Sequence, residues 1–238
     1  MRYMGGKFRI RKQVASYLNS IREEDQPYWE PFVGAAWILE QVNKKGPNYA
    51  SDANPYLISM WKALQDGWEP PATITEEQYL SIRNGQRDYP PELVAFVGFG
   101  CSWGGKWFGG YARGKEGRNY ALNAKNSVMR QIHNLTGVKF FVGNFLETFV
   151  PERKMLIYCD PPYATTTGYD AIEDEWDAKA FWDRVRWLEE HGHTVITSEY
   201  SAPEDAHCVL EIPTRTDMRS TSGQDPRIEK LFRIRMGH

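Results

Sequence analysis

The sequence has few of the residues that bind metals or form disulfides, with three cysteines and five histidines among 238 residues. Cys101, Cys159 and Cys208 lie far apart and form no Cys-x-x-Cys pair. The usual zinc and redox motifs are therefore absent. We expect reduced cysteines that pack in the protein interior, and no metal site.

Long apolar runs are also missing. No stretch approaches the roughly 18 to 20 apolar residues that cross a bilayer, and residues 1–12 carry positive charges where a signal peptide has an apolar core. We therefore expect a soluble, cytoplasmic protein. The formal net charge of −2 argues against a surface that is basic throughout, so any nucleic-acid-binding surface must be local.

Short apolar segments alternate with longer amphipathic ones, which is typical of an α/β fold with a doubly wound, mostly parallel sheet. Residues 207–212 and 227–235 alternate well enough to form two antiparallel strands, which places one reversed strand near the C-terminus. The other predicted strands are residues 28–33, 48–51, 138–142, 155–159 and 194–197, and the predicted helices are residues 7–18, 35–44, 55–64, 121–135 and 178–191.

The composition of the sequence changes between residues 65 and 126, where glycines and aromatic residues are too frequent for a core sheet. We interpret this region as an insertion, with residues 1–64 and 127–238 forming the main domain. Its cations are interleaved with aromatic residues, the mixture that phosphate neutralisation and base stacking need. The residues predicted to contact nucleic acid are Lys106, Trp107, Tyr111, Arg113, Lys115, Arg118 and Lys125.

The segment Asp160-Pro161-Pro162-Tyr163 follows a predicted hydrophobic strand directly. Each proline fixes its own φ and disfavours helix at the preceding residue, so the Asp160 carboxylate and the neighbouring carbonyls project at the carboxyl end of the strand. This is where doubly wound folds bind ligands. Rigid acceptors there can orient an exocyclic amine for attack on the methyl of a sulfonium, and the Tyr163 ring can stack on a flipped base.

Two further strand ends favour a nucleoside-like cofactor. Gly34 follows the first predicted strand and allows close approach of a ligand to the backbone, although taken alone a tight strand-to-helix turn explains it better. Asp52 ends the second strand and can accept both hydroxyls of a ribose. The alternative for Asp52 is the N-cap of the next helix, a role that Asn54 suits as well.

In this order the motifs resemble the Dam-type, D12-class N6-adenine-specific DNA methyltransferases over nearly the whole chain. The family opens with an aromatic-x-Gly-Gly-Lys motif, matched by Tyr3 to Lys7, and has an Asp-x-Asn, matched by Asp52 to Asn54. Its Gly-Asp-Phe triplet is Gly143-Asn144-Phe145 here, so the usual acid is missing. The resemblance assigns to the cofactor Tyr3, Lys7, Phe32, Gly34, Asp52, Asn144, Phe145 and Asp160, and to catalysis Asp160, Pro161, Pro162 and Tyr163.

The resemblance implies a Rossmann-like sheet that binds S-adenosyl-L-methionine and methylates N6 of adenine in double-stranded DNA after base flipping. It also implies a bacterial or phage-infected host, with residues 65–126 recognising the target. The family's Arg-Phe-Asn-like recognition pattern is absent, so the target sequence cannot be transferred. Two alternatives stay open, an amino methyltransferase acting on RNA or a protein amide, and an inactive relative that only binds DNA.

Overall fold

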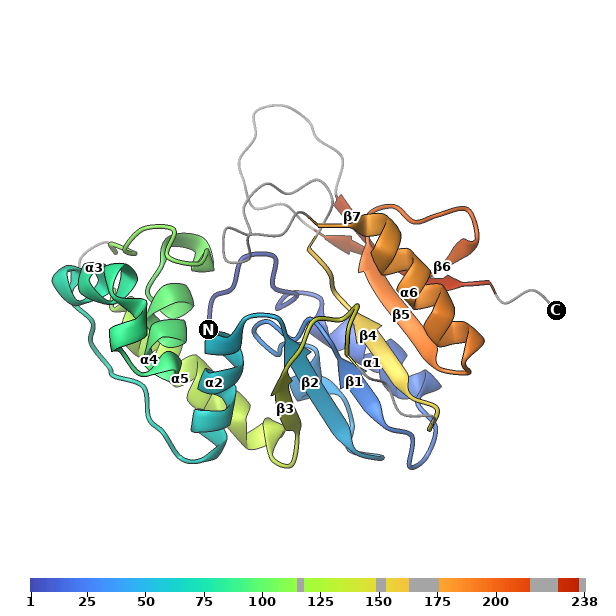
Figure 1. Ribbon diagram of the computed structural model, residues 1–238, viewed down its shortest axis with the longest axis horizontal. Coiled ribbons are helices and arrows are strands. Elements are labelled where there is room, and N and C mark those ends of the chain that lie inside the picture. The colour runs from blue at the N-terminus through green and yellow to red at the C-terminus, as the bar shows by residue number, and fades with distance from the viewer. Residues whose placement is uncertain (115–117, 149–152, 163–175, 215–226, 236–238) are drawn as a thin grey trace.

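The fold is built on one mixed sheet. The computed structural model describes residues 1–114, 118–148, 153–162, 176–214 and 227–235. Within them the strand order is β3-β2-β1-β4-β5-β7-β6 (Figure 1). Strand β7 runs in the direction opposite to the other six, antiparallel to β5 on one side and to β6 on the other. The predicted α/β fold with one reversed strand near the C-terminus is confirmed. The strands are β1 (Tyr28–Glu30), β2 (Asn48–Asp52), β3 (Lys139–Val142), β4 (Leu156–Cys159), β5 (Thr194–Glu199), β6 (Ala206–Thr214) and β7 (Arg227–Ile234).

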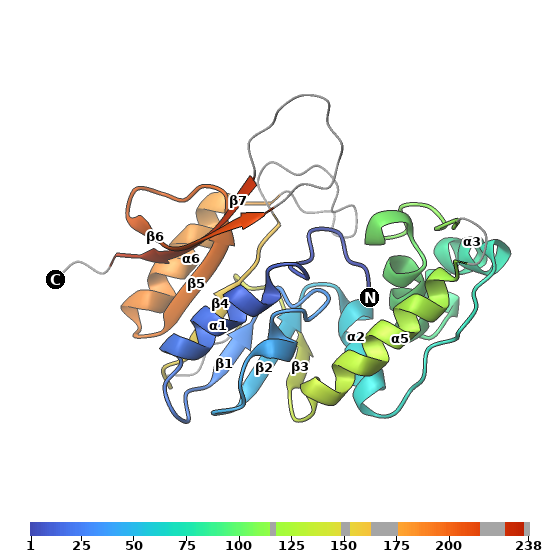
Figure 2. The same cartoon turned by 180° about the vertical axis from the view of Figure 1, so that it is seen from behind.

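Alternate residues along the strands enter two separate cores because successive side chains of a strand point to opposite faces. Tyr28 and Leu156 belong to one cluster, and their neighbours Trp29 and Ile157 to the other. Helices α1 (Arg11–Ile21), α2 (Pro55–Gln65) and α5 (Tyr120–Ile132) contribute to the first cluster, and α6 (Ala178–Glu190) contributes to the second (Figures 1 and 2). Among the described residues, no helix has the length and apolar character needed to cross a membrane.

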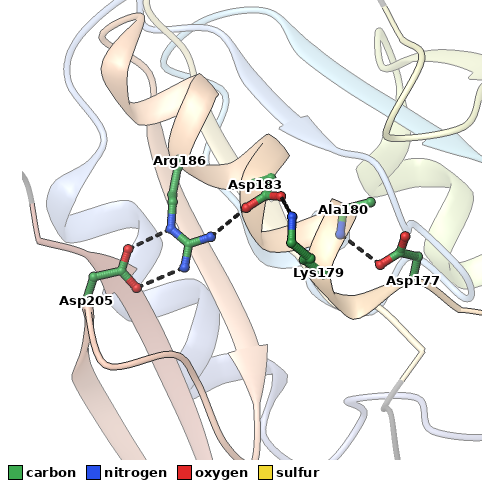
Figure 3. A network of polar contacts seen from close by, with 6 residues as sticks. All are labelled: Asp177, Lys179, Ala180, Asp183, Arg186 and Asp205. Carbon is green, nitrogen blue, oxygen red and sulfur yellow. Dashed lines mark hydrogen bonds and ion pairs between the residues drawn. The ribbon is translucent and has the colours of Figure 1, made fainter.

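Helix α6 is capped and fastened to the sheet by polar contacts (Figure 3). Asp177 caps its first turn by accepting a hydrogen bond from the backbone of Ala180 at 2.9 Å. Arg186 bridges Asp183 at 2.9 Å and Asp205, just before β6, at 2.6 Å. The cap fixes the start of the helix, and Arg186 fastens the second half of the helix to the segment before β6.

The helix predicted for residues 35–44 is wrong. The segment forms turns and a single 3-10 turn at Leu39–Gln41. Ala36 has a φ of +56°, which an α-helix does not allow. The carbonyls of Gly34 and Ala35, which a helix would use, instead accept hydrogen bonds from Trp61 and Gln131 at 3.0 and 2.8 Å. Side chains from α2 and α5 thus replace helical hydrogen bonding.

Residues 65–126 form a helical region beside α2, on the β3 side of the sheet (Figure 1). It contains α3 (Glu76–Asn84), α4 (Pro91–Ala95) and a π-helical turn at Phe96–Gly100 that is buried throughout. Gly98 is required within that turn, because an added Cβ would lie 2.6 Å from the Trp107 ring. Helix α5 crosses residue 126, so the region and the main domain share a helix. The division at residues 64 and 127 remains a prediction.

Candidate active site

A cavity of about 320 Å³ lies where the loops after β1, β2, β3 and β4 meet, at the carboxyl edge of the sheet. Parallel strands end on the same edge, so residues far apart in sequence converge there. All the residues predicted for the cofactor line this cavity, as do Pro161 and Pro162, whereas Tyr163 lies outside the described residues. The cofactor set is Tyr3, Lys7, Phe32, Gly34, Asp52, Asn144, Phe145 and Asp160.

Asp160 follows β4 and is held by a buried lysine. The Nζ of Lys7 donates to its Oδ1 at 2.7 Å and lies 3.6 Å from Oε1 of Glu229. Burial pulls the pKa of Lys7 down, but the charges of Asp160 and Glu229 outweigh this, so the pKa is raised from its ordinary value. Lys7 therefore stays charged and neutralises part of the negative charge at this edge.

Two more acids are buried beside this pair. Glu30, at the end of β1, lines the cavity, and its Oε1 accepts a hydrogen bond from the hydroxyl of Tyr28 at 2.5 Å. Burial, reinforced by the charge of Asp160, raises the pKa of Glu30 to about 8. Burial likewise raises the pKa of Glu199, at the end of β5, to about 7. Glu30 is therefore largely protonated at neutral pH and Glu199 partly so, and the negative charge of this edge lies mainly on Asp160.

Gly34 and Asp52 connect the loop after β1 to the end of β2 by a hydrogen bond. The Asp52 carboxylate accepts hydrogen bonds from the backbone of Gly34 at 3.1 Å and of Asn54 at 3.0 Å, and burial raises its pKa to about 6. Asn54 caps α2 by accepting from Leu57. The capping alternative for Asp52 is thus excluded. Gly34 has a φ of +46°, and an added Cβ would lie 3.0 Å from the Tyr3 ring, so only glycine fits this wall of the cavity.

Asn144 and Phe145 form the wall beyond β3. The Asn144 Oδ1 accepts a hydrogen bond from the backbone of Leu146 at 3.0 Å, which shapes the turn. Phe145 is 2% exposed and packs against Phe32 and Phe181 at ring-centroid distances of 5.4 and 5.3 Å. This wall offers an apolar, aromatic surface of the kind that a planar ring system binds.

The residues predicted to contact nucleic acid are not brought together in one patch. Lys106 and Trp107 line the cavity itself, and Tyr111 packs on Tyr79 with its hydroxyl bonded to the Ile74 carbonyl. Arg113 pairs with Glu76, and Lys125 pairs with Glu69 at 3.0 Å. Arg118 lies over the ring of Tyr120, and Lys115 falls outside the described residues.

Sequence reasoning missed several residues of the site. Phe99 and Gly105 of the helical region line the cavity, and the backbone of Met4 donates to the Gly105 carbonyl at 3.1 Å. Trp176 adds to the aromatic wall beside Phe32. Glu229 was also missed; it lies near the start of the reversed strand β7. An acid at that position is the signal that could have found it.

Comparison with known proteins shows similarity to DNA adenine methyltransferases. Residues 3–89 match the model of the D12 class N6 adenine-specific DNA methyltransferases. The DNA adenine methylases of two strains of Vibrio cholerae serotype O1 are 27% identical over 195 residues, which cover 69% of this chain. The matched part spans 64% of the length of those relatives.

Solved structures with a similar course of the chain also include methyltransferases. The rRNA methyltransferase aviRa from Streptomyces viridochromogenes has a TM-score of 0.43 at 12% identity, covering 97% of this chain and 86% of that one. The putative methyltransferase yhhF from Escherichia coli has a TM-score of 0.41 at 10% identity, covering 96% and 86%. At this level of similarity, the assignment of the fold depends on the strand order given above.

Proposed function

We propose that this chain, which resembles the D12 class of N6 adenine-specific DNA methyltransferases over residues 3–89, transfers a methyl group from S-adenosyl-L-methionine to N6 of adenine in DNA. The observation that carries the proposal is the convergence of all the predicted cofactor residues on one cavity whose edge is Asp160-Pro161-Pro162. A volume of about 320 Å³ lies within the range of small-molecule sites.

The residues of the cavity fit this cofactor. The Asp52 carboxylate can accept the hydroxyls of a ribose, and the aromatic wall around Phe32 and Phe145 can pack on an adenine. Gly34 leaves open the space that any side chain would fill. The Asp160 carboxylate, which lines the cavity, suits a sulfonium cation. When bound, the cofactor supplies an electrophilic methyl group.

In our mechanism Asp160 and the carbonyl of Pro161 accept hydrogen bonds from the exocyclic amine of a flipped adenine. These acceptors orient the nitrogen lone pair, which forms the new C–N bond as the C–S bond breaks and leaves its electron pair on sulfur. The nitrogen, positively charged at that stage, then releases one proton to solvent water. Lys7 holds the Asp160 carboxylate at 2.7 Å while this charge develops.

We further propose that residues 65–126 recognise the target, with residues 1–64 and 127–238 forming the catalytic domain. Lys106 and Trp107 connect this region to the cavity. Trp103 is 65% exposed on the turn between Ser102 and Gly105, and offers a ring face to DNA bases. Arg118 offers a positive charge to phosphate.

The test is Asp160→Ala in a methyl-transfer assay with radiolabelled cofactor and mixed-sequence duplex DNA, followed by identification of the methylated base. We expect loss of transfer by at least about a hundredfold, because the amine loses its main acceptor. Asp205→Asn is the matched control, since Asp205 pairs with Arg186 away from the cavity. Unchanged turnover of Asp160→Ala, or a preference for RNA or protein as methyl acceptor, would contradict the proposal.

A further inference from the structure

The reversed strand β7 brings its first residues, and not its last, to the edge where the parallel strands end. In the register of the sheet Lys230 pairs with Glu199, the last residue of β5. Glu229 therefore lies one residue beyond the end of β5, and Asp160, one residue beyond the end of β4, is level with Ser198 at the same edge. A parallel strand in this place would carry a residue so early in the strand to the opposite edge of the sheet.

The ends of β1, β4, β5 and β7 place their polar side chains on one face. Residues alternate between faces along a strand, so Ser198 shares the face of Ile196, and Glu229 that of Leu231. Asp160 continues the same face two residues after Tyr158. The Oγ of Ser198 donates to Oε1 of Glu229 at 2.6 Å, so the carboxylate of Glu229 is itself held in place.

Lys7 lies between the two carboxylates that meet on this face. Its Nζ is 2.7 Å from Oδ1 of Asp160 and 3.6 Å from Oε1 of Glu229, and its side chain is 6% exposed. Glu229 is equally enclosed, with a side-chain exposure of 7%, and it does not line the cavity. Among the described residues, Lys7 is placed between Glu229 and Asp160 and can transmit the influence of Glu229 to a reacting group.

A buried ammonium moves toward whichever carboxylates surround it, because charges inside a protein interact more strongly than in water. With both acids charged, Lys7 is drawn from two directions and its position is defined. With Glu229 neutralised, the attraction of Asp160 would no longer be opposed from that side, and the Asp160 carboxylate would be drawn toward the ammonium in turn. Small displacements of a group that orients a substrate lower the rate strongly.

We propose that Glu229 is a positioning residue for Asp160 that acts through Lys7, with Ser198 fixing its carboxylate. The inference depends on the proposed methyl transfer, in which Asp160 orients the amine. The reversed strand β7 then contributes to the site, because it carries Glu229. The contacts run in series from Ser198 through Glu229 and Lys7 to Asp160.

The experiment measures kcat and the KM for the cofactor in Glu229→Gln, in Lys7→Gln and in the double variant. Glutamine keeps an oxygen for the Ser198 hydrogen bond but removes the charge. We expect Glu229→Gln to lower kcat about tenfold with less than about a twofold change in KM, because the donor site is untouched. In the Lys7→Gln background the same substitution should change kcat less than about twofold, since residues that act in series are not additive.

Two further variants control the result. Glu211→Gln removes a carboxylate from β6 that pairs with Lys230 at 3.4 Å, on the opposite face of the sheet, and kcat should stay within about twofold of wild type. Ser198→Ala frees the Glu229 carboxylate without changing its charge, and should lower kcat about threefold. If Glu229→Gln fails to fold in thermal unfolding, Ser198→Ala decides the question.

The outcomes separate this inference from the proposed function. An active wild type with a Glu229→Gln kcat within about twofold of it overturns the inference alone. The inference is also overturned if the double variant lowers kcat by the product of the two single-variant factors, because Glu229 and Lys7 would then act independently. A wild-type chain that methylates no DNA under any of these conditions overturns the proposed function instead.

Discussion

The carboxyl edge of the sheet and the helical region of residues 65–126 both carry residues that the sequence marks as functional, yet they use them differently. At the edge, Gly34, Asp52 and Asp160 line one cavity. In the helical region, Arg113 and Lys125 pair with acids, and Tyr111 is packed among aromatic residues. The residues at the strand ends therefore converge on one cavity, whereas Arg113, Lys125 and Tyr111 each have a different set of neighbours.

The two regions differ in what determines the position of each residue. A residue just after a parallel strand is placed by the backbone of the sheet, and its neighbours on that edge follow from strand order. A residue in a helical region is placed by whichever side chains it packs against. Glu69 and Glu76, which neutralise the cations of the region, lie at least some thirty residues before them in the chain. The following predictions probe this difference.

The largest effect is expected from Gly34→Val. The new side chain would be forced into a φ of +46° and would approach the Tyr3 ring within 3.0 Å, filling the cavity wall. We expect affinity for S-adenosyl-L-methionine, measured by calorimetry, to fall more than about a hundredfold, about 3 kcal/mol. Gly67→Val is the control, because Gly67 has a φ of +91° with open space around it. Equal losses of affinity in both variants would mean that strain, and not the cavity, is responsible.

Glu30→Gln should change stability in a pH-dependent way. The pKa of Glu30 is raised from 4.5 to about 8, so the unfolded chain ionises this group first, and wild type loses stability as pH rises from 4.5 to 8. The variant lacks this loss and should exceed wild type at pH 9 by a few kcal/mol, to order of magnitude, but match it near pH 4. Denaturant unfolding at both pH values measures this, with the exposed Glu77→Gln as control. A difference that is the same at both pH values would exclude ionisation as the cause.

Much of the edge was predictable from sequence, since strands of the right type at the right places and the turn after β4 follow from apolar runs and prolines. The segment after Gly34 was not, because its carbonyls are taken by Trp61 and Gln131 from distant helices. Glu229 was not assigned, although antiparallel strands were predicted there, because its contact with Lys7 depends on the register of β7 against β5. The packing of Tyr111 on Tyr79 likewise depends on contacts between segments that no local pattern encodes.

In the helical region the strongest expected effect belongs to Trp103, whose side chain is 65% exposed. If its ring stacks on DNA, Trp103→Ala should weaken binding to duplex DNA by about 1–2 kcal/mol, roughly five- to thirtyfold. Trp103→Phe should keep most of the affinity. Trp187→Ala, which removes another exposed tryptophan from α6, should leave binding unchanged. Fluorescence anisotropy with labelled duplexes measures all three, and equal effects of the two alanine variants would refute a specific contact.

The smallest effect tests whether the cations of the helical region exchange partners on binding. Arg113 is exposed and pairs with Glu76, and an exposed ion pair contributes only about 0–1 kcal/mol to stability. Glu76→Gln should therefore leave the free energy of unfolding almost unchanged but release Arg113, raising affinity for DNA up to about threefold at low salt and steepening its salt dependence. The double variant Glu76→Gln/Arg113→Gln should lose this gain. If affinity rises equally in the double variant, removal of negative charge alone accounts for it, and Arg113 is a structural residue of the helical region that DNA does not reach.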